Sequence, residues 1–186
     1  MESLVFKGRP HAASGERTYE LSATHLTVSE PVASARRIPL SEIEEVALSY
    51  MGTGQGRTYC NIKTRRHGTI HIRSHHFAGL GAFEDRHESF DPFLSALCRA
   101  VAEKNPKATF HSGSWLYFGI WFAVFLIAAG FAIGFLNQIL STGDFEAEPV
   151  MGVVVGIGLA CTALAAALAN KVEPFDPKEP PVLEYE

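Results

Sequence analysis

WLYFGIWFAVFLIAAGFAIGFL, at residues 115–136, decides the architecture of this chain, because these 22 consecutive residues carry no charge. As an α-helix the segment would be about 33 Å long, enough to cross the ~30 Å hydrocarbon core of a bilayer. A second uncharged segment, VMGVVVGIGLACTALAAALA, occupies 20 residues at 150–169. A core helix of a soluble protein keeps a polar face, and neither segment has one. The sequence therefore predicts two transmembrane helices that form a hairpin.

The charges around these segments predict their orientation. The loop at 138–149 contains three carboxylates and no Lys or Arg, whereas Lys and Arg precede the first segment and Lys171 follows the second directly. Lys and Arg stay on the cytoplasmic side of membranes, so both termini are expected in the cytoplasm and the loop outside. We therefore expect transmembrane helices at 115–137 and 150–170.

Small residues spaced four apart predict how the two helices pack. Gly130 and Gly134 lie near the outer end of the first, and Gly152, Gly156 and Ala160 lie on the second. Such rows let helix backbones approach closely in lipid. Their shared depth favours packing within the hairpin, and self-association of the whole protein through the same rows is the alternative. Apart from the Cys161 thiol neither segment has an ionisable residue, which disfavours a transporter.

The remaining composition excludes several classes of protein. The chain has 186 residues, 47% hydrophobic and 19% charged, with a net charge of −4. Residues 1–111 hold 14 Lys and Arg against 12 Asp and Glu, so the soluble part is close to neutral. These values argue against a simple soluble enzyme, a disordered chain and a nucleic-acid binder that relies on bulk positive charge.

Short alternating runs predict a β-rich domain before the helices. The predicted strands are residues 17–21, 25–28, 36–40, 45–51, 58–64 and 69–74. In the last two strands one face is apolar, formed by Cys60, Ile62, Ile70 and Ile72. This spacing favours a small antiparallel sandwich or barrel. An amphipathic helix is expected at 92–103, with Asp91 as its N-cap and Pro92 as its first residue, while 75–89 has no clear assignment.

A family resemblance rests on "YELSATHLTV" (19–28), "RRIPLSEIEEVALSY" (36–50), "TYCNIKT" and "TIHIRS", followed by one helix. This order resembles the PH-like domains of bacterial membrane proteins, which are bent seven-stranded barrels closed by a C-terminal helix. The fold class is then α+β plus membrane helices, with a PH-like domain at 15–105 between an N-terminal segment (1–14) and a juxtamembrane linker (106–114).

The resemblance implies a non-enzymatic binding or scaffold module in a bacterial inner membrane, and it transfers no active site or cofactor. The expected partners are the bilayer and a protein of unknown identity. Lipid-binding members carry basic residues around the first hairpin. Residues 22–24 of this chain contain none, which disfavours inherited phosphoinositide binding.

A group of cations suggests a docking face on the last two strands. Its members are Lys63, Arg65, Arg66, His71 and Arg73. Such a group could attract anionic lipid, at about 1 kcal/mol per cation; an ordinary solvated sheet face is the alternative. The acidic, proline-rich tail at 171–186 is expected to be extended and could dock on this face or on a partner.

Other clusters point to chemistry less strongly. His67, His71, His75 and His76 suggest a metal-binding or pH-sensing regulator as the alternative function. On a strand, however, residues four apart are about 13 Å from each other, too far for one ion.

Gly52, Gly54 and Gly56 precede a predicted strand and not a helix, which favours a turn over a phosphate loop. Cys60, Cys98 and Cys161 are isolated and favour reduced surroundings without disulfide or zinc.

Overall fold

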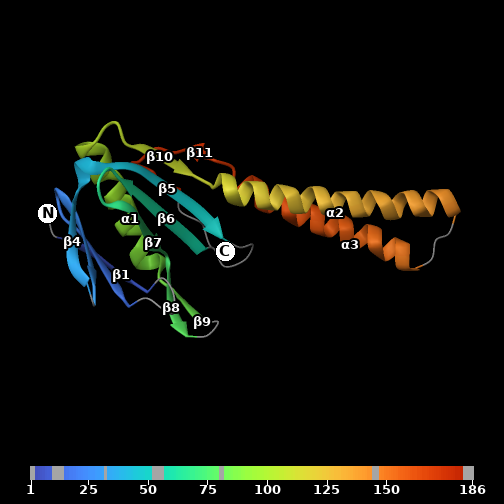
Figure 1. The fold of residues 1–186 in the computed structure, drawn as a ribbon, viewed down its shortest axis with the longest axis horizontal. Helices are drawn as coiled ribbons and strands as arrows, with labels where there is room; N and C mark the ends of the chain where they lie inside the picture. Colours follow the sequence, from blue (N-terminus) through green and yellow to red (C-terminus); the bar gives the residue numbers. More distant parts are fainter. Residues whose placement is uncertain are drawn as a thin grey trace. The chain divides into compact units, whose positions relative to one another are not determined.

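The computed structural model describes residues 3–9, 15–31, 33–51, 57–79, 82–143 and 147–181. The chain forms two compact units. One, the β-sheet domain, comprises Met1–Ser112 with Glu173–Glu186, and the other, the helix hairpin, comprises Gly113–Val172 (Figure 1).

A four-stranded antiparallel sheet begins the β-sheet domain, with its strands in chain order. The strands are β1 (Leu4–Gly8), β2 (Arg17–Leu21), β3 (His25–Glu30) and β4 (Ala33–Pro39). Placing residues 1–14 outside the domain was wrong, because Phe6 on β1 is opposite Tyr19 on β2 and only 1% exposed. Phe6 is the one large buried side chain of β1, so the sequence of β1 shows little alternation of apolar and polar residues.

The second sheet has the order β11-β10-β5-β6-β7. Its antiparallel centre consists of β5 (Ile43–Met51), β6 (Arg57–Thr64) and β7 (Gly68–Arg73), reached from β4 through the short helix η1 (Leu40–Glu42). Strand β10 (Thr109–Ser112) runs parallel to β5, and β11 (Glu173–Pro174) pairs with β10. Residues 106–114 were therefore wrongly predicted to be only a linker. The predicted glycine turn at 52–56 lies outside the described residues.

The connection that had no assignment forms a third, two-stranded sheet. It consists of β8 (His75–Gly79) and β9 (Ala82–Asp85), followed by helix α1 (His87–Lys104). The predicted helix start was wrong: Asp85 Oδ1 accepts a hydrogen bond of 3.0 Å from the backbone N–H of His87. The helix begins at His87 with Arg86 as its N-cap, and both Asp91 and Pro92 lie inside it.

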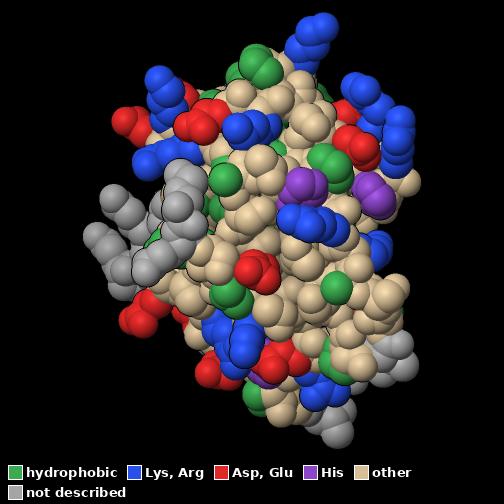
Figure 2. All heavy atoms as spheres, turned by 90° about the vertical axis from the view of Figure 1, so that its left-hand side faces the viewer, with side chains coloured by type: hydrophobic (Ala, Val, Ile, Leu, Met, Phe, Trp, Pro, Cys, Tyr) green, Lys and Arg blue, Asp and Glu red, His purple; other side chains and the backbone are tan. Residues whose placement is uncertain are grey.

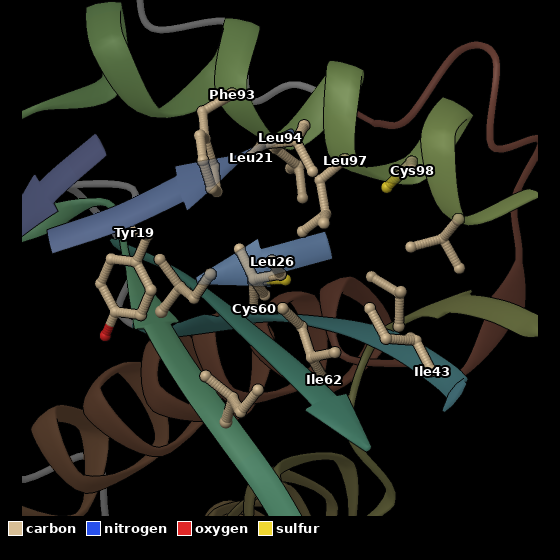
Figure 3. Packing of buried hydrophobic residues seen from close by; sticks show 14 of the residues in the cluster. Tyr19, Leu21, Leu26, Ile43, Cys60, Ile62, Phe93, Leu94, Leu97 and Cys98 are labelled. Atoms are coloured by element: carbon tan, nitrogen blue, oxygen red, sulfur yellow. The ribbon is translucent and has the colours of Figure 1, made fainter. Parts of the chain in front are cut away.

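One hydrophobic core lies between the two larger sheets and α1 (Figure 3). The predicted apolar face of β6 and β7 is buried, and so is the predicted stripe of α1, formed by Phe93, Leu94, Leu97, Cys98 and Val101. The alternation of these elements is thus confirmed. Among the described strands the hydrogen-bonded ladders form separate sheets and no closed barrel, so the domain is a mixed α+β fold.

The helix hairpin consists of α2 (Trp115–Thr142) and α3 (Ala147–Ala169). Ser114 Oγ accepts a hydrogen bond from the N–H of Tyr117 at the start of α2, and Gly143 ends that helix in the left-handed conformation. The most apolar windows of the two helices have mean hydropathies of 2.3 and 2.2 and are only 11% and 22% buried. Both helices are long and apolar enough to cross a membrane.

Candidate functional site

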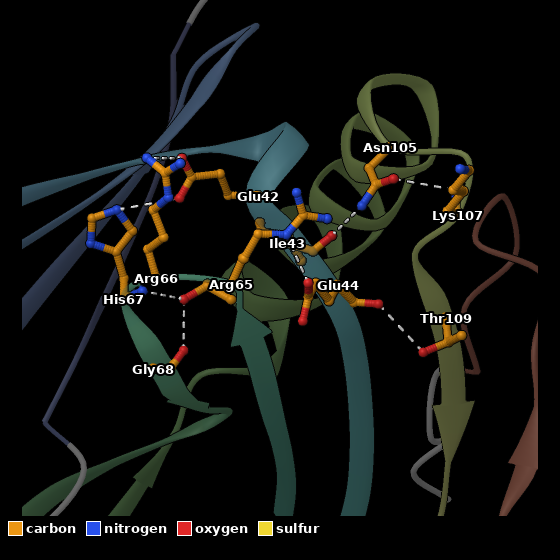
Figure 4. A network of polar contacts seen from close by, with 11 residues as sticks. Glu42, Ile43, Glu44, Arg65, Arg66, His67, Gly68, Asn105, Lys107 and Thr109 are labelled. Atoms are coloured by element: carbon orange, nitrogen blue, oxygen red, sulfur yellow. Dashed lines mark hydrogen bonds and ion pairs between the residues drawn. The ribbon is translucent and has the colours of Figure 1, made fainter.

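The predicted docking cations lie on β6, on β7 and in the turn between them. Figure 4 shows Arg65 and Arg66 of that turn beside Glu42 of η1 and Glu44 of β5. Three cations have acidic partners within 4 Å, in the pairs Arg65 Nε–Glu44 Oε1 (3.0 Å), Lys63 Nζ–Glu45 Oε2 (3.9 Å) and Arg66 Nη1–Glu42 Oε1 (3.9 Å). We call these six residues, with His71 and Arg73, the charged face.

Strand register explains why carboxylates join the cations. Glu45 is directly opposite Lys63 in the β5–β6 pairing, so the two side chains share one side of the sheet. Sequence reasoning missed the carboxylates because it treated the last two strands without their neighbour. The segment SEIEEV, which precedes them in the same antiparallel run, was the available signal. The pairs are exposed and contribute only about 0–1 kcal/mol each, yet they offset the positive charge expected to attract anionic lipid.

The remaining two members of the charged face are held by neutral and aromatic neighbours. His71 Nδ1 lies 2.6 Å from Asn61 Oδ1. Partial burial, helped by Arg73 and Arg17, lowers the pKa of His71 below its usual 6.5, so this ring is neutral at pH 7. The guanidinium of Arg73 lies over the ring of Tyr59, 5.0 Å from its centroid.

Charges of both signs are interspersed on one whole end of the β-sheet domain. Figure 2 shows the face at the left of Figure 1, where Lys and Arg side chains alternate with Asp and Glu. Ion pairs also occur on β2, β3 and β4, where Glu30 pairs with Arg17 at 3.1 Å and with Arg36 at 3.5 Å. Neither face presents a large patch of one sign, which is the usual requirement for steering nucleic acid or a strongly charged partner.

The clustered histidines occupy four different environments. His67 Nε2 lies 3.7 Å from Glu42 Oε2, and His76 Nδ1 accepts a hydrogen bond from the N–H of Arg9. His75 is buried, with its ring edge-on to Tyr59. Within the described ranges no three His, Cys, Asp or Glu side chains are close enough together to hold a metal ion. The metal-regulator hypothesis therefore has no assembled ligand set there.

The cysteines are free thiols in two kinds of surroundings. Cys60 and Cys98 are fully buried in the core (Figure 3), and burial raises the pKa of Cys98 to about 12 and that of Cys60 well above 9. Because the thiolate is the reactive form, these two residues are chemically inert packing groups. Cys161 is exposed on α3.

The glycine rows of the hairpin do not pack against each other as predicted. On α3, a Cβ on Gly152 would lie 2.6 Å from the ring of Phe135, and a Cβ on Gly156 would lie 2.9 Å from that of Ala132. On α2, Gly130 and Gly134 have no atom of another element within 4 Å of such a Cβ. The face of α2 that meets α3 instead contains Ala128 and Ala132, which are buried. They lie two residues, about half a helical turn, from the glycines and therefore on the other side of α2.

A groove of about 630 Å³ lies beside this interface. Its lining is apolar except for Glu148 and includes Phe131, Phe135, Met151 and Leu159. In a bilayer such a groove would accept lipid chains or another helix.

The tail docks on its own domain, but away from the charged face. Strand β11 pairs with β10, and the ring of Phe175 packs on Phe110 with centroids 5.9 Å apart. Arg99 on α1 donates two hydrogen bonds to the backbone oxygen of Lys178. The expectation of docking at 59–73 was thus wrong for residues 173–181, because backbone pairing and ring packing hold the tail at the opposite edge of the sheet. Residues 182–186 lie outside the described residues.

Two features of the described residues thus stand out as candidate interaction sites, namely the charged face of the β-sheet domain and the apolar surface of the helix hairpin. The first has one more cation than carboxylates, and the second is chemically suited to lipid. No family model matches this chain, and no curated protein or solved structure matches it either.

Proposed function

We propose that this chain is a non-enzymatic integral membrane protein that displays a cytoplasmic PH-like interaction module on a two-helix hairpin. The observation that carries the proposal is the composition and exposure of α2 and α3. In the most apolar part of each helix, about nine-tenths of the residues of α2 and about four-fifths of those of α3 are not buried. Apolar side chains exposed on this scale are stable in lipid and not in water.

The order of elements in the β-sheet domain supports the PH-like assignment. Four antiparallel strands are followed by three more, by the two-stranded hairpin of β8 and β9, and then by one helix that packs on the shared core. The β8–β9 hairpin is additional to the seven strands of the PH-like domains that the sequence resembles, which also end in one helix and serve as scaffolds for binding. The module proposed here acts by contact and not by catalysis, with the bilayer and a protein as its partners.

The flanking charges support the proposed orientation in a bacterial inner membrane. Asp144, Glu146 and Glu148 lie around the start of α3, whereas Lys171 follows its end. The positive-inside rule then places the short loop outside and both termini, with the β-sheet domain, in the cytoplasm.

Cysteine accessibility tests both the membrane insertion and the orientation. In a Cys161→Ala background, Ser141→Cys places a thiol at the end of α2 and Ser34→Cys places one on β4. Both serines are exposed and the substitutions are matched. We expect a membrane-impermeant maleimide to label position 141 in intact cells, and position 34 only after permeabilisation.

Two results would contradict the proposal in different ways. Labelling of position 34 in intact cells would reverse the orientation. Extraction of the protein from membranes by alkaline carbonate would show that α2 and α3 do not span the bilayer. If both tests succeed, cross-linking in native membranes followed by co-purification identifies the protein partner.

A further inference from the structure

The groove beside the α2–α3 interface lies entirely within the helix hairpin, where the two helices run side by side (Figure 1). Residues between 128 and 135 of α2 and between 147 and 159 of α3 line it. Four of its apolar side chains are at least half exposed, namely Phe131, Met151, Val155 and Leu159. The hairpin therefore leaves an apolar hollow of about 630 Å³ that its own side chains do not fill.

The groove is about as long as one leaflet of a bilayer is thick. Its lining on α3 extends from Ala147 to Leu159, which at 1.5 Å per residue is about 18 Å. Half of a ~30 Å hydrocarbon core is about 15 Å. An acyl chain that lies along the groove would therefore stay within a single leaflet.

One carboxylate lies at the end of the groove that is nearest the loop between the helices. Glu148 is the only charged residue in the lining, and it comes two residues before the uncharged segment at 150–169. When α3 spans a bilayer, a charged side chain at this position stays at the level of the lipid headgroups. Glu148 thus combines with the apolar lining in the way that a headgroup combines with its acyl chain.

The hairpin has no cation of its own near this carboxylate. Residues 112–170 contain no Lys, Arg or His. Lys171 follows the opposite end of α3, about 34 Å from Glu148 along a helix of this length. A positive partner for Glu148 at this depth must therefore come from outside the hairpin.

This charge pattern distinguishes a lipid from a second copy of the chain. A second copy in the same orientation would bring only uncharged helices and another Glu148 to this depth, so that like charges would approach each other. A phospholipid with a primary amine supplies an apolar chain for the groove and a cation for the carboxylate. Its ammonium donates hydrogen bonds to a carboxylate, whereas the quaternary ammonium of a choline headgroup has no N–H to donate.

We propose that the groove holds one acyl chain of a phospholipid whose headgroup carries a primary amine, with that amine paired to Glu148. The inference rests on the proposed function, because the groove meets lipid only if α2 and α3 span the bilayer. It goes beyond that function by naming the lipid chemistry that the hairpin selects. The bound lipid neutralises the one carboxylate of the groove and fills the space that the hairpin leaves open.

Photocross-linking in lipid nanodiscs tests this inference on the full-length chain. The two probes are phosphatidylethanolamine and phosphatidylcholine that carry the same diazirine in one acyl chain, each added as a minor component to unlabelled phosphatidylcholine. After irradiation and digestion, mass spectrometry locates the linked residues. We expect the ethanolamine probe to give about two to five times as much product in residues 147–159 as the choline probe, the preference that one exposed ion pair supports.

Two matched pairs of variants separate the charge from the shape of the groove. Glu148→Gln keeps the size of the side chain and should make the two probes equal, whereas Glu103→Gln, the same change at an exposed position of α1, should leave the preference intact. Val155→Trp places a ring in the groove and should lower the product of both probes. Val154→Trp is its control, because the neighbouring Val154 is exposed and does not line the groove.

Three results would overturn the inference. They are equal yields from the two probes in the native chain, a preference that survives Glu148→Gln, and disulfide-linked dimers of Met151→Cys in a Cys161→Ala background that form in place of the lipid products. The last result would show that a second copy covers the groove. Extraction of the chain by alkaline carbonate would overturn the proposed function together with the inference, whereas equal yields from a carbonate-resistant chain would overturn the inference alone.

Discussion

Ala132 of α2 packs directly against Gly156 of α3, so that a Cβ atom on Gly156 would lie 2.9 Å from the Cβ of Ala132. Real Cβ atoms do not approach so closely, and the helices must separate if position 156 gains a side chain. The contact therefore limits what position 156 can hold.

Gly156→Val is expected to destabilise the helix hairpin by about 1–3 kcal/mol, the usual cost of overpacking. Gly158→Val is the matched control, because the same change on the same helix meets no atom within 4 Å. Thermal unfolding in detergent, followed by circular dichroism, should show a lower midpoint for the first variant only. Equal midpoints would mean that α2 and α3 do not pack as described.

Gly113→Ala is expected to destabilise the hairpin more than Gly143→Ala. Both glycines flank α2 with positive φ, +92° and +69°, so each alanine incurs about 1–2 kcal/mol of backbone strain. Only at position 113 would the new Cβ also overlap the backbone oxygen of Lys171. The same thermal measurement separates the two effects, and identical losses would show that the close approach to Lys171 is absent.

Phe175→Ala should release the tail from the β-sheet domain. Phe175 is half-buried on the core beside Phe110, and removal of a partly buried ring costs about 1–2 kcal/mol. Hydrogen–deuterium exchange should become faster in residues 173–179 and in 109–112. If exchange accelerates in 59–73 instead, the tail docks on the charged face after all.

A pair of substitutions tests the backbone contact of the same tail. Arg99→Ala removes the two hydrogen bonds to the backbone oxygen of Lys178, whereas Lys178→Ala keeps that oxygen in place. Exchange in 173–179 should accelerate in the first variant and not in the second. An effect of Lys178→Ala alone would point to the lysine side chain as the attachment.

His71 should make the folded state less stable as the pH falls below about 6.5. Its pKa is lowered in the folded protein by burial and by Arg73 and Arg17. Below pH 6.5 the unfolded chain therefore binds the proton more readily than the folded one. The folded state loses stability as the pH falls until it passes the folded pKa, and below that pH the loss is complete and constant. Denaturant unfolding at several pH values should show a shallower loss of stability in His71→Asn than in the native chain. Parallel pH profiles would refute the assignment.

Local patterns were sufficient to determine the helices and most of the strands. The uncharged segments at 115–136 and 150–169 are helical as predicted, and a segment of this composition that crosses a bilayer would have to satisfy its backbone hydrogen bonds within itself. The alternation at 58–64 and 69–74 set which side chains are buried, because the period of two belongs to the strand itself. These features depend on neighbours only a few residues away.

Tertiary structure alone decided the pairings between distant segments. The parallel register of Thr109 with Glu45, the partnership of Glu45 with Lys63, and the packing of Phe175 on Phe110 join residues many positions apart. Short segments such as 4–8 and 109–112 become strands only when a sheet edge supplies their hydrogen-bond partners. Spacing along the chain does not specify how two packed helices are rotated about their axes. It therefore does not predict which glycine row faces the neighbouring helix. The local sequence pattern thus determined which side chains each segment buries, and the assembled fold determined which distant residues each segment contacts.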